Sequence, residues 1–150
     1  MGRIDFYHLK RQTLEEVLPK LLQKAYATGK RILIKLPPEK VEEINTFLWT
    51  YNDESFLPHG SKKDGFAEEQ PIWLTDIDNN ANNAQFLFLV CGAQSEIEYG
   101  SRYERIFNVF DGNDETALTQ ARQLWRTYKE AGFEVHYWQQ TPSGSWEQKV

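Results

Sequence analysis

The run Q-F-L-F-L-V-C-G at 85–92 is the feature that most constrains the fold of this chain. Five consecutive large apolar residues bounded by polar ones are typical of a strand buried on both faces, which is a central strand of a parallel sheet. No apolar run in the sequence approaches the ~20 residues that span a bilayer. We therefore expect a soluble, cytoplasmic α/β protein built around this strand.

Strands and helices alternate along the rest of the chain. Other short runs rich in β-branched and aromatic residues predict strands at 3–9, 31–37, 71–76, 103–111 and 133–140. Apolar residues recur at helical spacing in 14–25, from 38 to before Asn52, and in 114–131. This alternation predicts a single α/β domain over 1–150, with an open, mostly parallel sheet and helices on both faces.

The ends of these helices carry recognisable signals. Thr13 and Glu16 have the spacing of a capping box, and Gly29 and Gly132 stand where the first and last helices should stop. Pro19 fits badly inside the first helix, so we expect that helix to begin two or three residues late or to bend there.

The stretch from Asn52 to Gln70 lacks periodicity. It contains Pro58, Gly60 and Gly65, which favour turns over regular elements. We interpret it as an irregular, exposed and mobile segment.

Charge and cysteine content exclude some classes of protein. The net charge of −5 argues against a protein that binds nucleic acid over its whole surface, because phosphate contacts require a basic field. Cys91 is the single cysteine, so no internal disulfide can form and a reducing compartment is compatible.

Nucleotide-binding signatures are absent or incomplete. Gly60 and Gly65 have the spacing of a phosphate-binding loop, but Phe66 and Ala67 occupy the lysine and hydroxyl positions. No glycine-rich fingerprint follows Leu9, as a dinucleotide-binding fold would require. We expect no nucleotide cofactor.

Metal and nucleophile signatures are equally weak. Asp76, Asp78 and Asn80 imitate the start of a calcium loop, but the glycine and the bidentate carboxylate that should follow are missing, which favours a polar turn. Cys91 could in principle pair with a histidine, although a cysteine in a buried strand is usually structural. We expect no catalytic residue and no metal.

Bulky apolar groups gather where the second helix ends. They are Trp49, Phe56, Leu57 and Pro58. Large aromatics are mostly buried, so one interpretation places Trp49 and Phe56 in the core. The other is a partner-binding patch, because Trp and Phe beside Pro are frequent interface anchors.

The last helix carries a basic stripe. Arg122, Arg126 and Lys129 recur at i, i+4 and i+7, away from the apolar stripe of the same helix. A solvated basic face is the plain interpretation. Trp125 adds an aromatic wall beside guanidinium groups that can hold carboxylates bidentately, which suits a short acidic peptide ending in an aromatic residue.

An ordered series of segments resembles the chi subunit family of bacterial DNA polymerase III (HolC-like). The segments are F-Y-H-L near the N-terminus, G-K-R-I-L-I at 29–34, L-W at 48–49, E-S-F-L-P-H at 54–59 and A-R-x-x-W-R-x-Y-K-x-A-G-F at 121–133. The resemblance implies a Rossmann-like fold that lacks nucleotide binding. It also implies a non-catalytic subunit of the replicative DNA-directed DNA polymerase, which bridges the clamp loader to single-stranded DNA-binding protein (SSB).

The resemblance assigns the two constellations to two partners. Arg122, Trp125 and Arg126, with Lys129, correspond to the helix that binds the acidic C-terminal tail of SSB. The patch at 49 and 56–58 corresponds to the surface that docks the psi subunit of the clamp loader. A repair helicase could use that patch instead. A degenerate nucleotide-binding enzyme, and a DNA binder acting through Lys62, Lys63 and the basic helix, also stay open.

Overall fold

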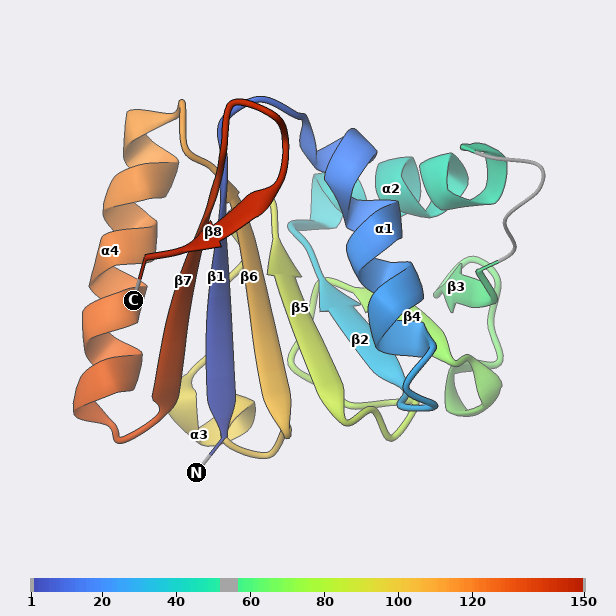
Figure 1. Cartoon of the computed structure of the whole chain (residues 1–150). Helices are drawn as coiled ribbons and strands as arrows, with labels where there is room; N and C mark the ends of the chain where they lie inside the picture. Colours follow the sequence, from blue (N-terminus) through green and yellow to red (C-terminus); the bar gives the residue numbers. More distant parts are fainter. Residues whose placement is uncertain (1, 52–56, 150) are drawn as a thin grey trace.

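The computed structural model describes residues 2–51 and 57–149 and contains one twisted sheet with helices on both sides (Figure 1). Eight strands follow the order β3-β4-β2-β5-β6-β1-β7-β8. The strands are β1 Arg3–Leu9, β2 Ile32–Lys35, β3 His59–Ser61, β4 Ile72–Thr75, β5 Phe86–Val90, β6 Arg105–Asp111, β7 Glu134–Gln140 and β8 Trp146–Gln148. Every neighbouring pair is parallel except the β7–β8 hairpin. The predicted open, mostly parallel α/β sheet is confirmed.

β5 lies in the interior of the sheet, as its apolar run predicts. Its five residues are all buried, between β2 on one side and β6 on the other. Because both faces of this strand are covered, each of its side chains removes apolar area from water, which explains why polar residues are missing from it.

The first helix begins where its capping box places it. In α1, Leu14–Tyr26, the Thr13 hydroxyl accepts the Glu16 N–H and the Glu16 carboxylate accepts the Thr13 N–H. Pro19 lies inside this helix and is buried. The expected late start is therefore wrong: two satisfied backbone donors hold the first turn, and the helix tolerates one lost hydrogen bond further along.

The other helices follow the predicted segments closely. α2 is Pro38–Thr50, and α4 is Glu115–Glu130 with Asp114 as its N-cap. The helix-stop glycines Gly29 and Gly132 adopt φ angles of 83° and 92°, which favour glycine over residues with a side chain. The four-residue α3, Ile97–Gly100, and a single 3₁₀ turn, Ala67–Glu69, carried no signal in the sequence.

Two apolar clusters cover the two faces of the sheet. α1 and α2 pack on one face, where Leu18, Leu22 and Ile44 lie among the residues of the first cluster. α4 packs on the other face through Ala121 and Tyr128. Figure 1 shows α1 in front of the sheet and α4 at its left side, beside β7. The predicted placement of helices on both faces is confirmed.

The segment after α2 is more ordered than expected. Leu57, His59 and Ser61 are buried, and 59–61 form the edge strand β3 beside β4. The prediction of an irregular, exposed stretch is wrong for 57–61. Polar partners explain the difference: the Asn45 amide donates to the Ser61 hydroxyl at 3.2 Å and to the Asp64 carboxylate at 2.7 Å.

Candidate functional site

The basic stripe lies on α4, which is anchored by its apolar side. Ala121 and Tyr128 are buried against the sheet, and Leu118 and Leu124 are partly buried beside them. The Asp114 carboxylate accepts the N–H groups of Thr116 and Ala117 and so fixes the start of the helix. The side chains at 122, 126 and 129 are left on the exposed side.

Trp125 joins the core side of α4 and the basic stripe. Its ring is partly buried and packs on the apolar cluster of this face. The Lys129 ammonium lies over the ring, 4.5 Å from its centroid, which is a cation–π contact. The Trp125 indole N–H is buried and has no hydrogen-bond partner among the described residues. The cation in contact with the Trp125 ring is therefore the ammonium of Lys129, whereas the sequence analysis expected guanidinium groups beside it.

The charge of Arg122 acts on two groups that belong to β1 and β7, His8 and Tyr137. The His8 ring bonds the Tyr137 hydroxyl at 2.7 Å. Burial lowers the pKa of His8, and the charges of Lys10 and Arg122 lower it further. Burial also raises the pKa of Tyr137, and the positive charge of Arg122 opposes this increase.

Trp49 is the exposed member of the aromatic patch. It occupies the last turn of α2 and keeps 47% of its surface exposed. Its ring packs on the imidazole of His59 at a centroid distance of 4.1 Å. A large exposed aromatic held by a buried partner is pre-organised for contact with another protein.

His59 is the supporting residue that the sequence analysis did not single out. It is buried, and its two ring nitrogens lie 2.5 Å from the Leu57 carbonyl and 3.1 Å from the Asn45 carbonyl. These contacts fix the plane of the ring beneath Trp49. The only sequence signal was its place at the end of E-S-F-L-P-H.

The other predicted patch residues differ in their placement. Leu57 is 3% exposed and belongs to the core cluster, so its assignment to a partner surface is corrected: its side chain is already covered by this chain. Pro58 is half-buried. Phe56 lies outside the described residues.

The two surfaces lie on different parts of the molecule. α4 contacts β1, β6 and β7, whereas α2 contacts β3 and β4 near the opposite edge of the sheet. α4 and α2 also pack on opposite faces of the sheet, since their buried residues belong to different apolar clusters. A partner on one surface would leave the other free.

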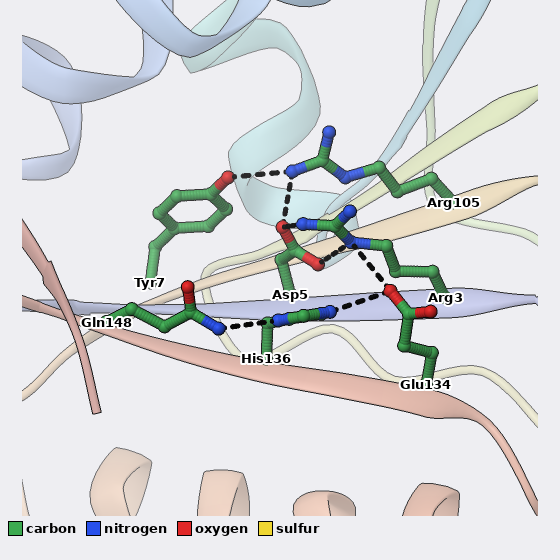
Figure 2. A network of polar contacts seen from close by, with 7 residues as sticks. All are labelled: Arg3, Asp5, Tyr7, Arg105, Glu134, His136 and Gln148. Atoms are coloured by element: carbon green, nitrogen blue, oxygen red, sulfur yellow. Dashed lines mark hydrogen bonds and ion pairs between the residues drawn. The ribbon is translucent and has the colours of Figure 1, made fainter. Parts of the chain in front are cut away.

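A polar network crosses β1, β6 and β7 on the α1 side of the sheet (Figure 2). The Asp5 carboxylate is fully buried and accepts two bonds from Arg3, at 2.7 and 3.1 Å, and a bond from Arg105. Arg105 also donates to the Tyr7 hydroxyl at 3.2 Å, and burial raises the pKa of Tyr7 to about 12. The buried carboxylate is thus paired with two guanidinium groups, although the Nε–H of Arg105 has no partner among the described residues, and we interpret this network as part of what stabilises the fold.

The loop after β1 is closed from within. The N–H groups of Lys10, Arg11 and Gln12 all donate to the side-chain oxygen of Gln140, at 3.1, 3.0 and 3.2 Å. Gln140 is buried at the end of β7. In dinucleotide-binding proteins the corresponding loop donates its N–H groups to phosphate. Here a neutral side chain of the same chain occupies that position.

Residues 2–51 and 57–149 contain no cluster of three or more His, Cys, Asp or Glu that could hold a metal ion. Within the same residues no helix is long and apolar enough to cross a membrane.

Two side chains that the sequence offered for chemistry have structural surroundings. Asp78 of the calcium-like segment pairs with Lys35 at 2.7 Å and accepts the Ser95 hydroxyl, in keeping with a polar turn. Burial raises the pKa of Cys91, which disfavours the reactive thiolate.

Comparison with known proteins identifies the family of the chain. The model of the family described as DNA polymerase III chi subunit, HolC, matches residues 1–136. The chain belongs to this family. A curated relative, the probable DNA polymerase III subunit chi of Rickettsia prowazekii (strain Madrid E), is 33% identical over 91 residues. That match covers 60% of this chain and 55% of the relative.

The description of this family names a subunit of DNA polymerase III. The matched residues include the whole of α2 and α4, on which the two candidate surfaces lie. The match ends within β7, so the rest of that strand and the whole of β8 lie beyond the part that the family model describes.

Proposed function

We propose that this chi-family chain is a non-catalytic, cytoplasmic accessory subunit of the DNA polymerase III holoenzyme. It tethers the clamp loader to the acidic C-terminal tail of SSB and reaches DNA only indirectly. The observation that carries the proposal is the exposed cationic side of α4, with Lys129 stacked on Trp125 in a chain whose net charge is −5.

The α4 surface has the chemistry to bind an acidic peptide ending in an aromatic residue. Arg122 and Arg126 are exposed one helical turn apart, so a carboxylate side chain and a terminal carboxylate can pair with them at once. The peptide's Phe ring would pack on apolar groups near Trp125. We expect affinity on the order of micromolar for one tail, because a short disordered peptide loses its freedom on binding. The several tails of SSB would raise it through avidity.

The Trp49 surface would hold the second partner, the psi subunit. Its exposed ring, its rigid support by His59 and its distance in the fold from α4 suit an interface anchor. Pro58 lies nearby in sequence and keeps part of its surface exposed.

A calorimetric titration with a synthetic acidic peptide ending in Pro-Phe tests the tail site. Arg122→Ala should weaken binding by roughly 1.5–3 kcal/mol, the range for a hydrogen bond to a charged group. Its free energy of unfolding should change by less than about 0.5 kcal/mol, because Arg122 is exposed. Lys24→Ala, which removes an exposed cation from α1, is the matched control and should bind as the wild type does.

The same peptide without its Phe separates a specific site from a charged surface. It should bind more weakly than the full peptide, and salt should reduce but not abolish binding of the full peptide, since the apolar contact is not screened. Equal affinities of wild type and Arg122→Ala would refute the assigned site. Equal affinities of the two peptides would reduce α4 to a nonspecific cationic surface.

A further inference from the structure

A cleft of about 820 Å³ lies at the carboxyl ends of the central strands, apart from both proposed partner surfaces. β1 leads to α1 on one face of the sheet and its neighbour β6 leads to α4 on the other, so the chain diverges between them (Figure 1). In open α/β sheets this divergence is where small ligands bind. The volume is also within the range of small-molecule sites.

The floor of the cleft contains an unpartnered amide. Asn108 is in the middle of β6 and only 6% exposed, with Phe6 of β1 and Leu89 of β5 as its sheet neighbours. Phe107 and Val109 point to the α1 side, so the alternation of the strand places the Asn108 side chain on the α4 side, beneath the first half of the helix. It makes no side-chain hydrogen bond to any residue that the structure describes.

No amide atom of Asn108 is among the side-chain atoms that are fully buried without a partner, so the amide opens onto the cleft, where water or a ligand can bond it. An amide provides one acceptor and two donors side by side, which pair with a ligand that offers a donor next to an acceptor. At the base of an open cleft, Asn108 therefore offers these groups to a molecule that enters from outside.

Apolar side chains flank the amide. They belong to Leu89, Phe110, Ala117, Ala121 and Leu124. The Phe110 ring supplies an aromatic surface, and an apolar lining around one polar group suits a heterocycle rather than a flexible polar chain.

The cleft does not favour a charged ligand. Its lining contains three cations and three carboxylates, namely Lys10, Arg11, Lys40, Glu15, Asp111 and Asp114. Lys40 is also paired with Glu43 at 2.9 Å. The backbone N–H groups that could hold a phosphate are taken by Gln140. These features select against phosphate and for a neutral ring.

We propose that the cleft binds an uncharged planar heterocycle with adjacent donor and acceptor, such as an adenine base, through the amide of Asn108. The phosphates of a nucleotide contribute nothing to this binding. The proposal goes beyond the tethering function and does not depend on it, because neither Arg122 nor Trp49 lines the cleft.

Titration of the full chain with adenosine tests the proposal, read by calorimetry and by the side-chain amide signal of Asn108 in NMR spectra. Adenosine should bind saturably, with a dissociation constant on the order of 0.1 mM from the usual efficiency of ligands of this size. Purine riboside, which lacks the amino donor, should bind at least about fivefold more weakly, the loss of one neutral hydrogen bond. AMP should bind with a dissociation constant within about twofold of that of adenosine, because the backbone N–H groups that could hold its phosphate already donate to Gln140.

Asn108→Leu should weaken adenosine binding at least about fivefold while the protein stays folded, because leucine removes an unpartnered polar group. Gln123→Leu makes the same exchange at an exposed position of α4 outside the cleft lining and should change nothing. Absence of saturable adenosine binding, equal affinities for adenosine and purine riboside, or clearly tighter binding of AMP would each overturn the proposal. These ligand comparisons use the wild type and stand even if a variant fails to fold.

Discussion

Replacement of Asp5 by asparagine should destabilise the fold more than any change to an exposed charge of the same network. The Asp5 carboxylate is 0% exposed and holds Arg3 and Arg105, whose side chains are 36% and 29% exposed (Figure 2). Asparagine keeps the volume but loses the negative charge, and its amide group must face a guanidinium. The comparison therefore isolates charge from packing.

The magnitude follows from burial. Removing one partner of a buried ion pair costs about 3–5 kcal/mol, and partial solvation of the two guanidinium groups reduces this to about 2–3 kcal/mol. For a chain of this size the Tm should fall by about 5–10 °C. Urea denaturation followed by circular dichroism measures the loss directly.

Glu134→Gln is the matched control, because Glu134 is 64% exposed and 3.8 Å from Arg3. It should cost less than about 0.5 kcal/mol, as exposed pairs usually do. If Asp5→Asn lost less than about 1 kcal/mol, the buried carboxylate would not be essential to the stability of this part of the sheet.

Three further perturbations test other parts of the fold. Gly112→Ala should lower the free energy of unfolding, measured by thermal denaturation, by about 1–3 kcal/mol, because a Cβ there meets the His8 ring and lies 2.7 Å from the Leu9 carbonyl. If the variant were as stable as the wild type, the loop would be able to move and accommodate the added methyl group. Burial lowers the pKa of His8 from 6.5, so the unfolded chain binds more protons than the folded chain just below that pH, and the free energy of unfolding should fall as pH drops through 6.5. His8→Gln should reduce this dependence of stability on pH, and an unchanged dependence in the variant would contradict the assignment to His8. Gln140→Ala should lower the free energy of unfolding by about 1–3 kcal/mol, and millimolar phosphate should restore part of this loss. The stability of the wild type should not respond to phosphate. An equal response of the two proteins to phosphate would mean that Gln140 does not close an anion site.

Local signals in the sequence account for most of the regular elements. The capping box of Thr13 and Glu16 fixes the start of α1, and Gly132 marks the end of α4. The continuous apolar run identifies β5 as an interior strand. These predictions succeed because each depends on residues that lie close together in the sequence.

Elements that depend on distant partners could not be predicted in this way. β3 has three residues, too few to show periodicity, and its burial rests on Asn45 in the preceding helix. Likewise, nothing near Gln140 in the sequence indicates that its side chain closes the loop after β1. Pro19 is tolerated inside α1 because its ring is buried, and this packing, which offsets the lost hydrogen bond, depends on residues distant in the sequence.

The same distinction between local and long-range contacts applies to the candidate site. Helical spacing predicts that Arg122, Arg126 and Lys129 share the exposed side of α4, and they do. The sequence could not place Leu57 in the core or His59 beneath Trp49, because both depend on how the segment after α2 folds back onto the sheet.

Simultaneous binding of both partners is the most direct test of the tethering function. With the acidic peptide ending in Pro-Phe fixed to a biosensor surface, the wild-type chain should be captured and should then retain purified psi. Trp49→Ala should still be captured but fail to retain psi, while Arg122→Ala should lose capture by the peptide and still bind psi in solution. Release of the chain from the peptide when psi is added, or retention of psi by folded Trp49→Ala, would contradict the two-surface account.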